Sequence, residues 1–305
     1  MKIVFFGSDD FSLPFLEELL KENKEVSLVI TTQDKPRGRG KKILPNPVKE
    51  LANKKGIPFV EIKKSSDMYD YLEDSLWDLG IVVSFGKIIP GEVINLFKKG
   101  IINVHPSILP RYRGPNPIRW QILNKEGESG VSIMKITEGV DEGDVLMIKR
   151  IPLSGEETYT ELREKLISIG RKTLIEALEI IEKGKDEWKP QRGEVSYAPK
   201  FKRDFERIDW HEDAKKIKRK ILALSKEPGA YSIFRGKRLK ILKADVEEDE
   251  SKNPGEVVYV DKKIFKIGTG KGVIVPLILK PEGKREMNVK SFIAGYRPKL
   301  REKFE

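Results

Sequence analysis

The feature that most constrains this chain is the alternation of short apolar runs with helix-type segments over its first 184 residues. Such a pattern is typical of α/β domains. The run Leu79–Val83 is too apolar to form the edge of a sheet, so we expect a mostly parallel sheet that is covered on both faces. The first run, Ile3–Phe6, leads into a turn with a single glycine, Gly7, rather than a G-x-G-x-x-G motif. The sequence therefore predicts a Rossmann-like α/β domain without a dinucleotide site.

The run Ile101–His105 adds a second constraint, because it ends in polar residues and enters a basic, turn-rich loop up to Gly114. Residues two apart in a strand project from the same face, so Asn103 and His105 are expected side by side near the end of the strand. An Asn amide can stabilise a developing oxyanion, and a His imidazole can exchange a proton near neutral pH. The pair is a candidate catalytic site, with a core strand that merely ends in polar residues as the alternative.

An acidic turn, Gly139–Asp144, follows another apolar run, Val131–Ile136. It separates two strand-type segments, which predicts a hairpin-like return of the chain. Asp141 is a candidate to hold and polarise His105, because carboxylates orient catalytic imidazoles in other enzymes. From spacing alone, an ordinary acidic turn is the simpler interpretation.

The chain contains no cysteine, which excludes disulfides, thiolate metal sites and a cysteine nucleophile. Its two histidines are His105 and His211. One imidazole beside one carboxylate makes a poor ligand set, so we expect no metal. The apolar start, Met1–Gly7, is far too short for a secretory signal or a membrane span. These features favour a cytoplasmic protein with no membrane partner.

The net charge of +11 is concentrated in the last third of the chain. Residues 206–305 contain 25 Lys and Arg against 16 Asp and Glu, a net of +9, whereas residues 1–205 have a net of +2. A basic appendage indicates a polyanionic partner such as nucleic acid, although a solubilising surface would explain the charge equally well. Short strand-type runs with glycine turns between residues 231 and 279 predict a small β-barrel in this region.

Three ordered motifs resemble the folate-dependent formyltransferase superfamily. They are Asn103-Val-His-Pro-Ser-Ile-Leu-Pro-Arg-Tyr-Arg-Gly114, Gly130-Val-Ser-Ile-Met134 and Glu138-Gly-Val-Asp-Glu-Gly-Asp144. The similarity extends from Met1 to about Tyr296, and it is specific to the members that formylate a charged tRNA. It implies that 10-formyltetrahydrofolate is the cosubstrate and that the α-amine of methionine on initiator tRNA receives the formyl group.

The same resemblance implies roles for the candidate catalytic residues. Asn103, with help from His105, would stabilise the tetrahedral oxyanion. His105 and Asp141 would relay the proton that leaves the attacking amine towards the folate nitrogen, through water.

The resemblance also implies a folate site on two loops that follow strands. The residues expected to line it are Phe85, Gly86, Ile88, Ser107, Ile108, Leu109 and Pro110.

Two basic segments are expected to contact tRNA. The resemblance implies that the loop between Gln33 and Pro47 is the insertion that reaches the acceptor arm, with Arg39 as the family arginine. Lys41 and Lys42 are expected phosphate contacts in this loop. A helix expected over Asp209–Leu224 adds Lys215, Lys216 and Arg219.

We therefore expect a catalytic domain over residues 1–184, a surface linker over 185–205 and an oligonucleotide-binding (OB)-like, tRNA-binding barrel over 206–305. Nothing in the sequence demands more than a monomer. Two alternatives remain at this stage. One is a member of the superfamily that formylates a small amine, such as glycinamide ribonucleotide or an amino sugar nucleotide. The other is a non-catalytic RNA-binding module.

Overall fold

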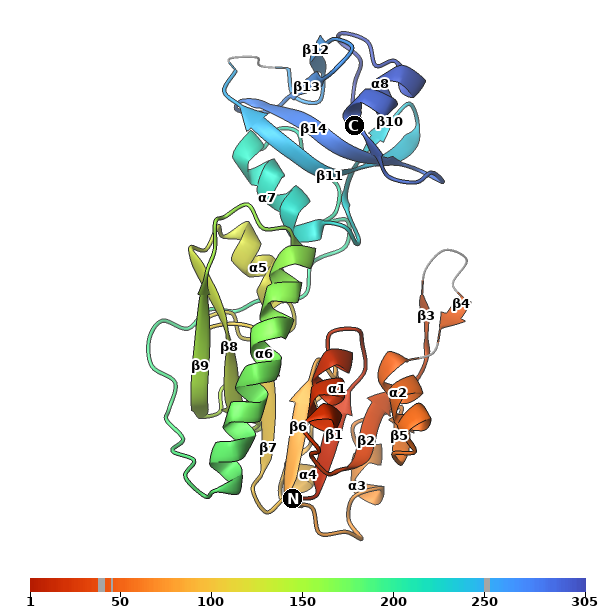
Figure 1. Cartoon of the computed structure of the whole chain (residues 1–305). Helices are drawn as coiled ribbons and strands as arrows, with labels where there is room; N and C mark the ends of the chain where they lie inside the picture. Colours follow the sequence, from red (N-terminus) through yellow and green to blue (C-terminus); the bar gives the residue numbers. More distant parts are fainter. Residues whose placement is uncertain (38–41, 45, 250–252) are drawn as a thin grey trace. The chain divides into compact units, whose positions relative to one another are not determined.

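The computed structural model describes residues 1–37, 42–44, 46–249 and 253–305. The chain forms two compact units (Figure 1). The first unit consists of Met1–Pro117, Glu128–Pro152 and Arg163–Pro199. The second unit consists of Ile118–Gly127, Leu153–Leu162 and Lys200–Glu305.

The first unit is built on a seven-stranded sheet with the order β5-β2-β1-β6-β7-β8-β9. The strands are β1 (Ile3–Gly7), β2 (Val26–Thr32), β5 (Phe59–Ile62), β6 (Leu79–Val83), β7 (Ile101–His105), β8 (Glu128–Lys135) and β9 (Val145–Pro152). Neighbours from β5 to β7 are parallel, whereas β7, β8 and β9 pair antiparallel. The predicted mostly parallel α/β sheet is thus confirmed, and so is the hairpin-like return of β8 and β9.

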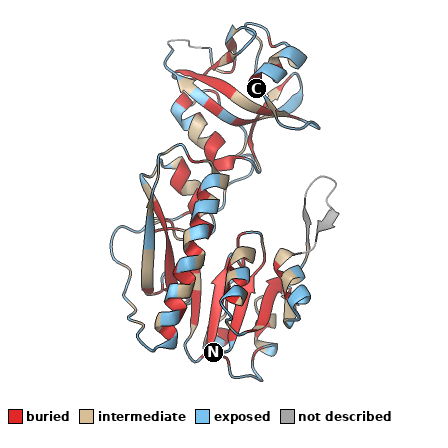
Figure 2. Cartoon of the chain, in the orientation of Figure 1, coloured by how far each residue is buried: buried red, intermediate tan, exposed pale blue. Residues whose placement is uncertain are grey.

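Strands β1 and β6 are buried along their whole length (Figure 2). Alternate residues of β1 face opposite sides of the sheet, and Val4 and Phe6 share one hydrophobic cluster with Met68 and Val93. These two partners come from the short helices α3 (Asp67–Asp70) and α4 (Gly91–Ile94). The central strand is covered on this face by helices of the β5–β6 and β6–β7 connections, and its burial explains the apolar run in the sequence.

The helices of this unit begin and end at recognisable signals. The sequence predicts helices over Leu13–Lys21, Pro47–Lys55 and Asp67–Leu76. Helices α1 (Leu13–Lys21) and α2 (Pro47–Lys55) match the first two, whereas the third is limited to α3. The long helix α6 (Tyr159–Glu182) follows a capping box, in which the Thr158 N–H donates to Glu161 Oε2 at 2.8 Å. Two short strands, β3 (Lys35–Arg37) and β4 (Lys42–Leu44), pair within the basic loop.

The second unit contains an antiparallel sheet with the order β10-β11-β14-β13-β12, and β15 pairs with β14. The strands are β10 (Ala230–Phe234), β11 (Lys237–Glu247), β12 (Val257–Val260), β13 (Phe265–Gly268), β14 (Val273–Pro281) and β15 (Met287–Asn288). The helices are α5 (Pro117–Leu123), α7 (Ala214–Leu224) and α8 (Val289–Tyr296). Helix α7 starts five residues later than predicted, because the Asp213 side chain caps it by accepting the Lys215 N–H.

Residues 301–305 connect the two outermost strands of this sheet. On one side Glu305 exchanges main-chain hydrogen bonds of 2.6 and 2.9 Å with Ile233 of β10. On the other side the Phe304 N–H donates to the Gly255 carbonyl at 2.7 Å, and the Val257 N–H donates to Glu302 at 2.9 Å. This short segment therefore satisfies the backbone groups of two strands that would otherwise be sheet edges.

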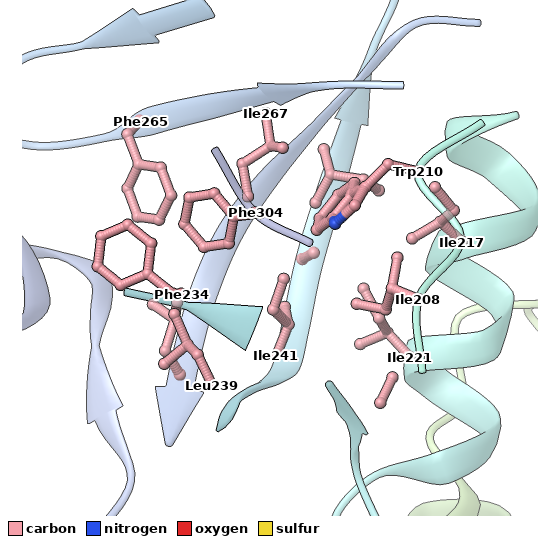
Figure 3. Packing of buried hydrophobic residues seen from close by; sticks show 14 of the residues in the cluster. Ile208, Trp210, Ile217, Ile221, Phe234, Leu239, Ile241, Phe265, Ile267 and Phe304 are labelled. Atoms are coloured by element: carbon pink, nitrogen blue, oxygen red, sulfur yellow. The ribbon is translucent and has the colours of Figure 1, made fainter. Parts of the chain in front are cut away.

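The same segment inserts an aromatic side chain into the core (Figure 3). The Phe304 ring is stacked at 4.6 Å from Phe234 and at 6.0 Å from Phe265, and it meets Trp210 edge-on at 6.1 Å. Phe304 is only 3% exposed. Buried aromatic side chains of this kind contribute strongly to core stability.

We predict that Phe304→Ala lowers the free energy of unfolding of the second unit by about 3–5 kcal/mol, the usual cost of truncating a buried Phe. Leu300→Ala is the matched control, because Leu300 lies just before this segment and is 58% exposed. Its effect should stay within about 0.5 kcal/mol. Urea unfolding followed by tryptophan fluorescence measures both, and equal effects would contradict the role of Phe304.

Candidate active site

The end of β7 carries the two polar side chains that the sequence singled out. Asn103 lies opposite Met134 of β8, and His105 lies opposite Ser132. The His105 side chain is 5% exposed. Its Nε2 lies 3.0 Å from the Tyr112 carbonyl oxygen. Because a carbonyl oxygen only accepts, Nε2 carries a proton, which leaves Nδ1 as the nitrogen that can accept one.

One carboxylate faces both side chains. Asp141 Oδ1 lies 3.4 Å from Asn103 Nδ2, and Asp141 Oδ2 lies 3.6 Å from His105 Nδ1. The Gly114 N–H donates to the same Oδ2 at 2.7 Å. The structure thus brings Asn103, His105 and Asp141 together. A proton on Nδ1 of His105 would face a carboxylate that a main-chain N–H already holds.

The acidic segment reaches this place by folding back over the sheet. Strand β8 runs antiparallel to β7, so its end at Lys135 lies opposite Ile102, roughly 10 Å from His105 by the rise of a strand. The connection to β9 returns to Lys135, whose N–H donates to the Asp144 carbonyl at 2.9 Å. A Cβ on Gly143 would collide with the Lys135 carbonyl oxygen. Glycine at this position therefore allows the loop to close and places Asp141 over the face of β7 that carries Asn103 and His105.

Gln191 is a residue of this site that sequence reasoning missed. Its Nε2 donates to the main-chain oxygens of Asp141 and Gly143, at 2.8 and 2.9 Å. Its Oε1 accepts from Arg113 Nε and Nη2, at 3.2 and 2.8 Å. The sequence offers no pattern around Gln191 that signals this role, because the residue stands alone in a stretch interpreted as a surface linker.

The residues expected to line a folate site differ in exposure. Phe85 is 3% exposed and belongs to the core, where its ring lies 5.5 Å from that of Phe6. Gly86 is exposed and has a φ of +74°, and Ile88 is 72% exposed.

The second group of these residues, Ser107, Ile108, Leu109 and Pro110, is buried. Ser107 Oγ donates to the Arg111 carbonyl at 2.6 Å. Ser132 Oγ donates to the Ser107 carbonyl at 2.7 Å and accepts the Leu109 N–H at 3.2 Å. The loop after β7 is therefore fixed to β8 by one buried hydroxyl.

The residues expected to contact tRNA come from the basic loop and from α7. Arg39 and Lys41 fall outside the described residues, and Lys42 is the first residue of β4. Lys215 and Lys216 are exposed on α7, and Arg219 is half-buried there. Within the described part of the chain, no group of His, Cys, Asp or Glu could hold a metal ion, and no helix is long and apolar enough to span a membrane.

Comparison with known families covers both units. A family model described as "Formyl transferase" matches residues 1–178, and "Formyl transferase, C-terminal domain" matches residues 200–297. This chain belongs to the formyl transferase family. The first match contains all three residues that converge at the end of β7, and the resemblance found in the sequence is thereby confirmed.

Formyl transferases of similar length are found among curated proteins. The methionyl-tRNA formyltransferase of Dictyoglomus thermophilum is 42% identical over 313 residues, which covers 100% of both chains. That of Thermodesulfovibrio yellowstonii is 37% identical over 295 residues, or 96% of this chain and 95% of the relative. A solved structure of HypX from Aquifex aeolicus in complex with tetrahydrofolic acid has a similar fold, with a TM-score of 0.66 at 24% identity. The alignment covers 99% of this chain, which spans about half (48%) of the length of HypX.

We predict that Ser132→Ala destabilises the first unit by about 1–3 kcal/mol, because it removes a fully buried hydroxyl that satisfies two main-chain groups. Ser66→Ala removes an exposed hydroxyl and should change the free energy of unfolding by less than about 0.5 kcal/mol. Thermal or urea unfolding compares the two variants. A Ser132→Ala protein as stable as wild type would rule out this anchor.

Proposed function

We propose that this protein transfers the formyl group of 10-formyltetrahydrofolate to the α-amine of methionine on initiator tRNA. The observation that carries the proposal is the convergence of three residues in a formyl transferase, where the Asp141 carboxylate lies 3.4 Å from Asn103 and 3.6 Å from His105. The substrate assignment is supported by full-length relatives named methionyl-tRNA formyltransferase. The protein would act in translation initiation.

Asn103 is proposed to stabilise the oxyanion. When the amine attacks the formyl carbon, the carbonyl oxygen becomes negatively charged, and an amide N–H aimed at it lowers the barrier. One such donor typically contributes about 3–4 kcal/mol. Asn103 Nδ2 carries two hydrogens, and Asp141 Oδ1 at 3.4 Å can occupy only one of them. The other remains for the substrate oxygen.

His105 is proposed to move the proton. The new bond joins the amine nitrogen to the formyl carbon, and the bond to the folate nitrogen breaks. The amine therefore loses a proton, and the folate nitrogen gains one. Since Nε2 of His105 donates to the Tyr112 carbonyl, Nδ1 is the atom that can accept and return this proton. Asp141 Oδ2, 3.6 Å away, stabilises the imidazolium in between.

The folate is proposed to lie against the two loops that follow β6 and β7, at Phe85, Gly86, Ile88 and Ser107–Pro110. These two loops offer a combination of apolar surface and open peptide groups, which suits a flat, polar heterocycle. Ile88 offers an exposed apolar surface, and Gly86, with a φ of +74°, has no side chain to cover its peptide groups. Ligands of open α/β sheets bind at such carboxyl ends of strands.

The tRNA is proposed to bind through basic residues of two segments, the loop between Gln33 and Pro47 and helix α7. These are Arg39, Lys41, Lys42, Lys215, Lys216 and Arg219.

We propose that residues 1–184 are catalytic, that 185–205 form a linker and that 206–305 form an OB-like barrel. The bridging of β10 and β12 by residues 301–305 supports a closed barrel. We further propose a cytoplasmic monomer.

The proposal predicts formylation of methionyl-tRNA when 10-formyltetrahydrofolate is the donor. Free methionine and glycinamide ribonucleotide serve as competing acceptors in the same assay. Transfer to the charged tRNA alone supports the proposal, whereas transfer to a small amine alone would overturn the substrate. Failure with every acceptor would overturn the enzymatic function itself.

His105→Ala should lower kcat about 10²- to 10⁴-fold, the range in which a general acid–base group contributes. The matched control is His211→Ala, which removes the other histidine, an exposed residue beside α7. Its kcat should equal that of the wild type. A His105→Ala protein that keeps full activity would exclude His105 from the proton relay.

Binding of tRNA should weaken with added salt, because each phosphate contact releases counterions. We expect Lys216→Gln to reduce the slope of log affinity against log salt by about one unit if Lys216 contacts a phosphate. Lys218→Met is the control on the same helix, since Lys218 already pairs with Glu156 at 2.6 Å and with Asp245 at 3.6 Å. Identical slopes for Lys216→Gln and wild type would remove Lys216 from the interface.

A further inference from the structure

The segment that contains Gln191 is bound closely to both loops of the site. This strap, residues 189–198, begins with an antiparallel pair, in which Lys189 and Val145 exchange hydrogen bonds of 2.8 and 3.0 Å. Further along, Ser196 accepts the Arg113 N–H at 2.9 Å through its carbonyl and the Tyr112 N–H at 3.0 Å through its hydroxyl. The Ala198 N–H donates to the Arg113 carbonyl at 2.7 Å. The strap thus joins the start of β9 to the loop after β7.

The Gln191 side chain links this strap to both loops through hydrogen bonds. Its two N–H groups meet the carbonyls of Asp141 and Gly143, and its oxygen meets two N–H groups of Arg113. The orientation of the amide follows from the chemistry, because carbonyls require donors and a guanidinium requires an acceptor. Both side-chain N–H groups of Gln191 therefore bind the acidic loop, while its side-chain oxygen binds Arg113.

The conformation of Asp141 shows why such a connection matters. Asp141 has a φ of +52°, in the left-handed region that residues other than glycine seldom adopt. A residue stays in that region only when its surroundings hold it there. The loop on which it lies is anchored at its base by Lys135, whereas its tip is held by Gly114, which bonds the carboxylate, and by Gln191, which bonds the main chain.

A small movement of that loop would separate Asp141 from Asn103 and His105. Asp141 is already 3.4 Å from Asn103 and 3.6 Å from His105, at or beyond the limit of a direct hydrogen bond. A displacement of about 1 Å can cost about a hundredfold in rate when it separates groups that must act together. Loss of the Gln191 amide would free the Asp141 main chain to make such a displacement.

We propose that Gln191 is a positioning residue that holds the Asp141 carboxylate against Asn103 and His105 by binding the main chain of the acidic loop. The kinetic test of this inference rests on the proposed function, because it measures kcat for the proposed reaction. The competing possibility is that Gln191 only attaches a surface strap and has no effect on the chemistry. In the positioning role, substituting Gln191 lowers kcat by displacing Asp141. In the purely structural role, it leaves kcat unchanged.

Two substitutions separate the functions of the Gln191 amide. Gln191→Met preserves length and removes both donors and the acceptor. Gln191→Glu keeps an acceptor for Arg113 but presents a carboxylate to the carbonyls of Asp141 and Gly143. Both variants should lose about ten- to hundredfold in kcat with little change in the KM for the formyl donor. Glu194→Gln is the control, because Glu194 is exposed on the same strap and should behave as wild type.

A double-mutant cycle with Asp141→Asn decides whether the effect passes through Asp141. If it does, Gln191→Met lowers kcat in the wild-type background and changes it less than about twofold in the Asp141→Asn background. If the two losses multiply, Gln191 acts independently of Asp141 and the proposal is overturned. Wild-type kcat for Gln191→Met overturns it as well.

Hydrogen exchange provides a readout that does not need activity. The amides of Gly139–Asp144 should exchange faster in Gln191→Met than in wild type and Glu194→Gln, because the loop opens more often. Unchanged exchange would overturn the positioning role even if the proposed reaction holds. A wild-type protein that formylates no acceptor would overturn the proposed function, and the exchange experiment would still decide whether Gln191 holds the loop.

Discussion

The proposed chemistry depends on the position of one carboxylate relative to one strand. A strand can present Asn103 and His105 together through its period of two, but it cannot supply a third group above them. That group, Asp141, comes from a loop that starts at the far end of the neighbouring strand and folds back over the sheet. Its main chain takes a conformation with φ of +52°, which the isolated loop would not favour. The contacts from Gly114 and Gln191 offset this cost.

The neighbouring strands of the first unit keep β7 fixed. Strand β7 has parallel β6 on one side and antiparallel β8 on the other, so both rows of its backbone hydrogen bonds are occupied. The change from parallel to antiparallel pairing at β7 has a direct consequence. It sends β8 back towards the start of β7 and allows a single connection to pass over the face of β7 that carries Asn103 and His105. A fully parallel sheet would need a crossover helix at this place.

The sequence predicted the parts of the site that side-chain patterns encode. Asn103 and His105 follow from strand periodicity, because residues two apart in a strand share a face. Gln191 could not be predicted in this way. Its strap is attached mainly through main-chain hydrogen bonds, such as those of Lys189 with Val145, and these leave no hydrophobic period in the sequence. Helix α8 was missed although Val289, Phe292, Ile293 and Tyr296 pack in or against the core at a spacing that indicates a helix.

The Tyr112 carbonyl limits how protons can move in the proposed reaction. It occupies Nε2 of the imidazole at 3.0 Å, and Tyr112 itself has a φ of +64°, which turns its peptide group towards His105. With Nε2 bound, proton exchange is confined to Nδ1, and Nδ1 faces Asp141. The direction of the relay is thus determined by a backbone oxygen rather than by the identity of any side chain at position 112. The Tyr112 N–H is bound in turn by Ser196 of the strap, so the segment that holds the acidic loop also orients the histidine.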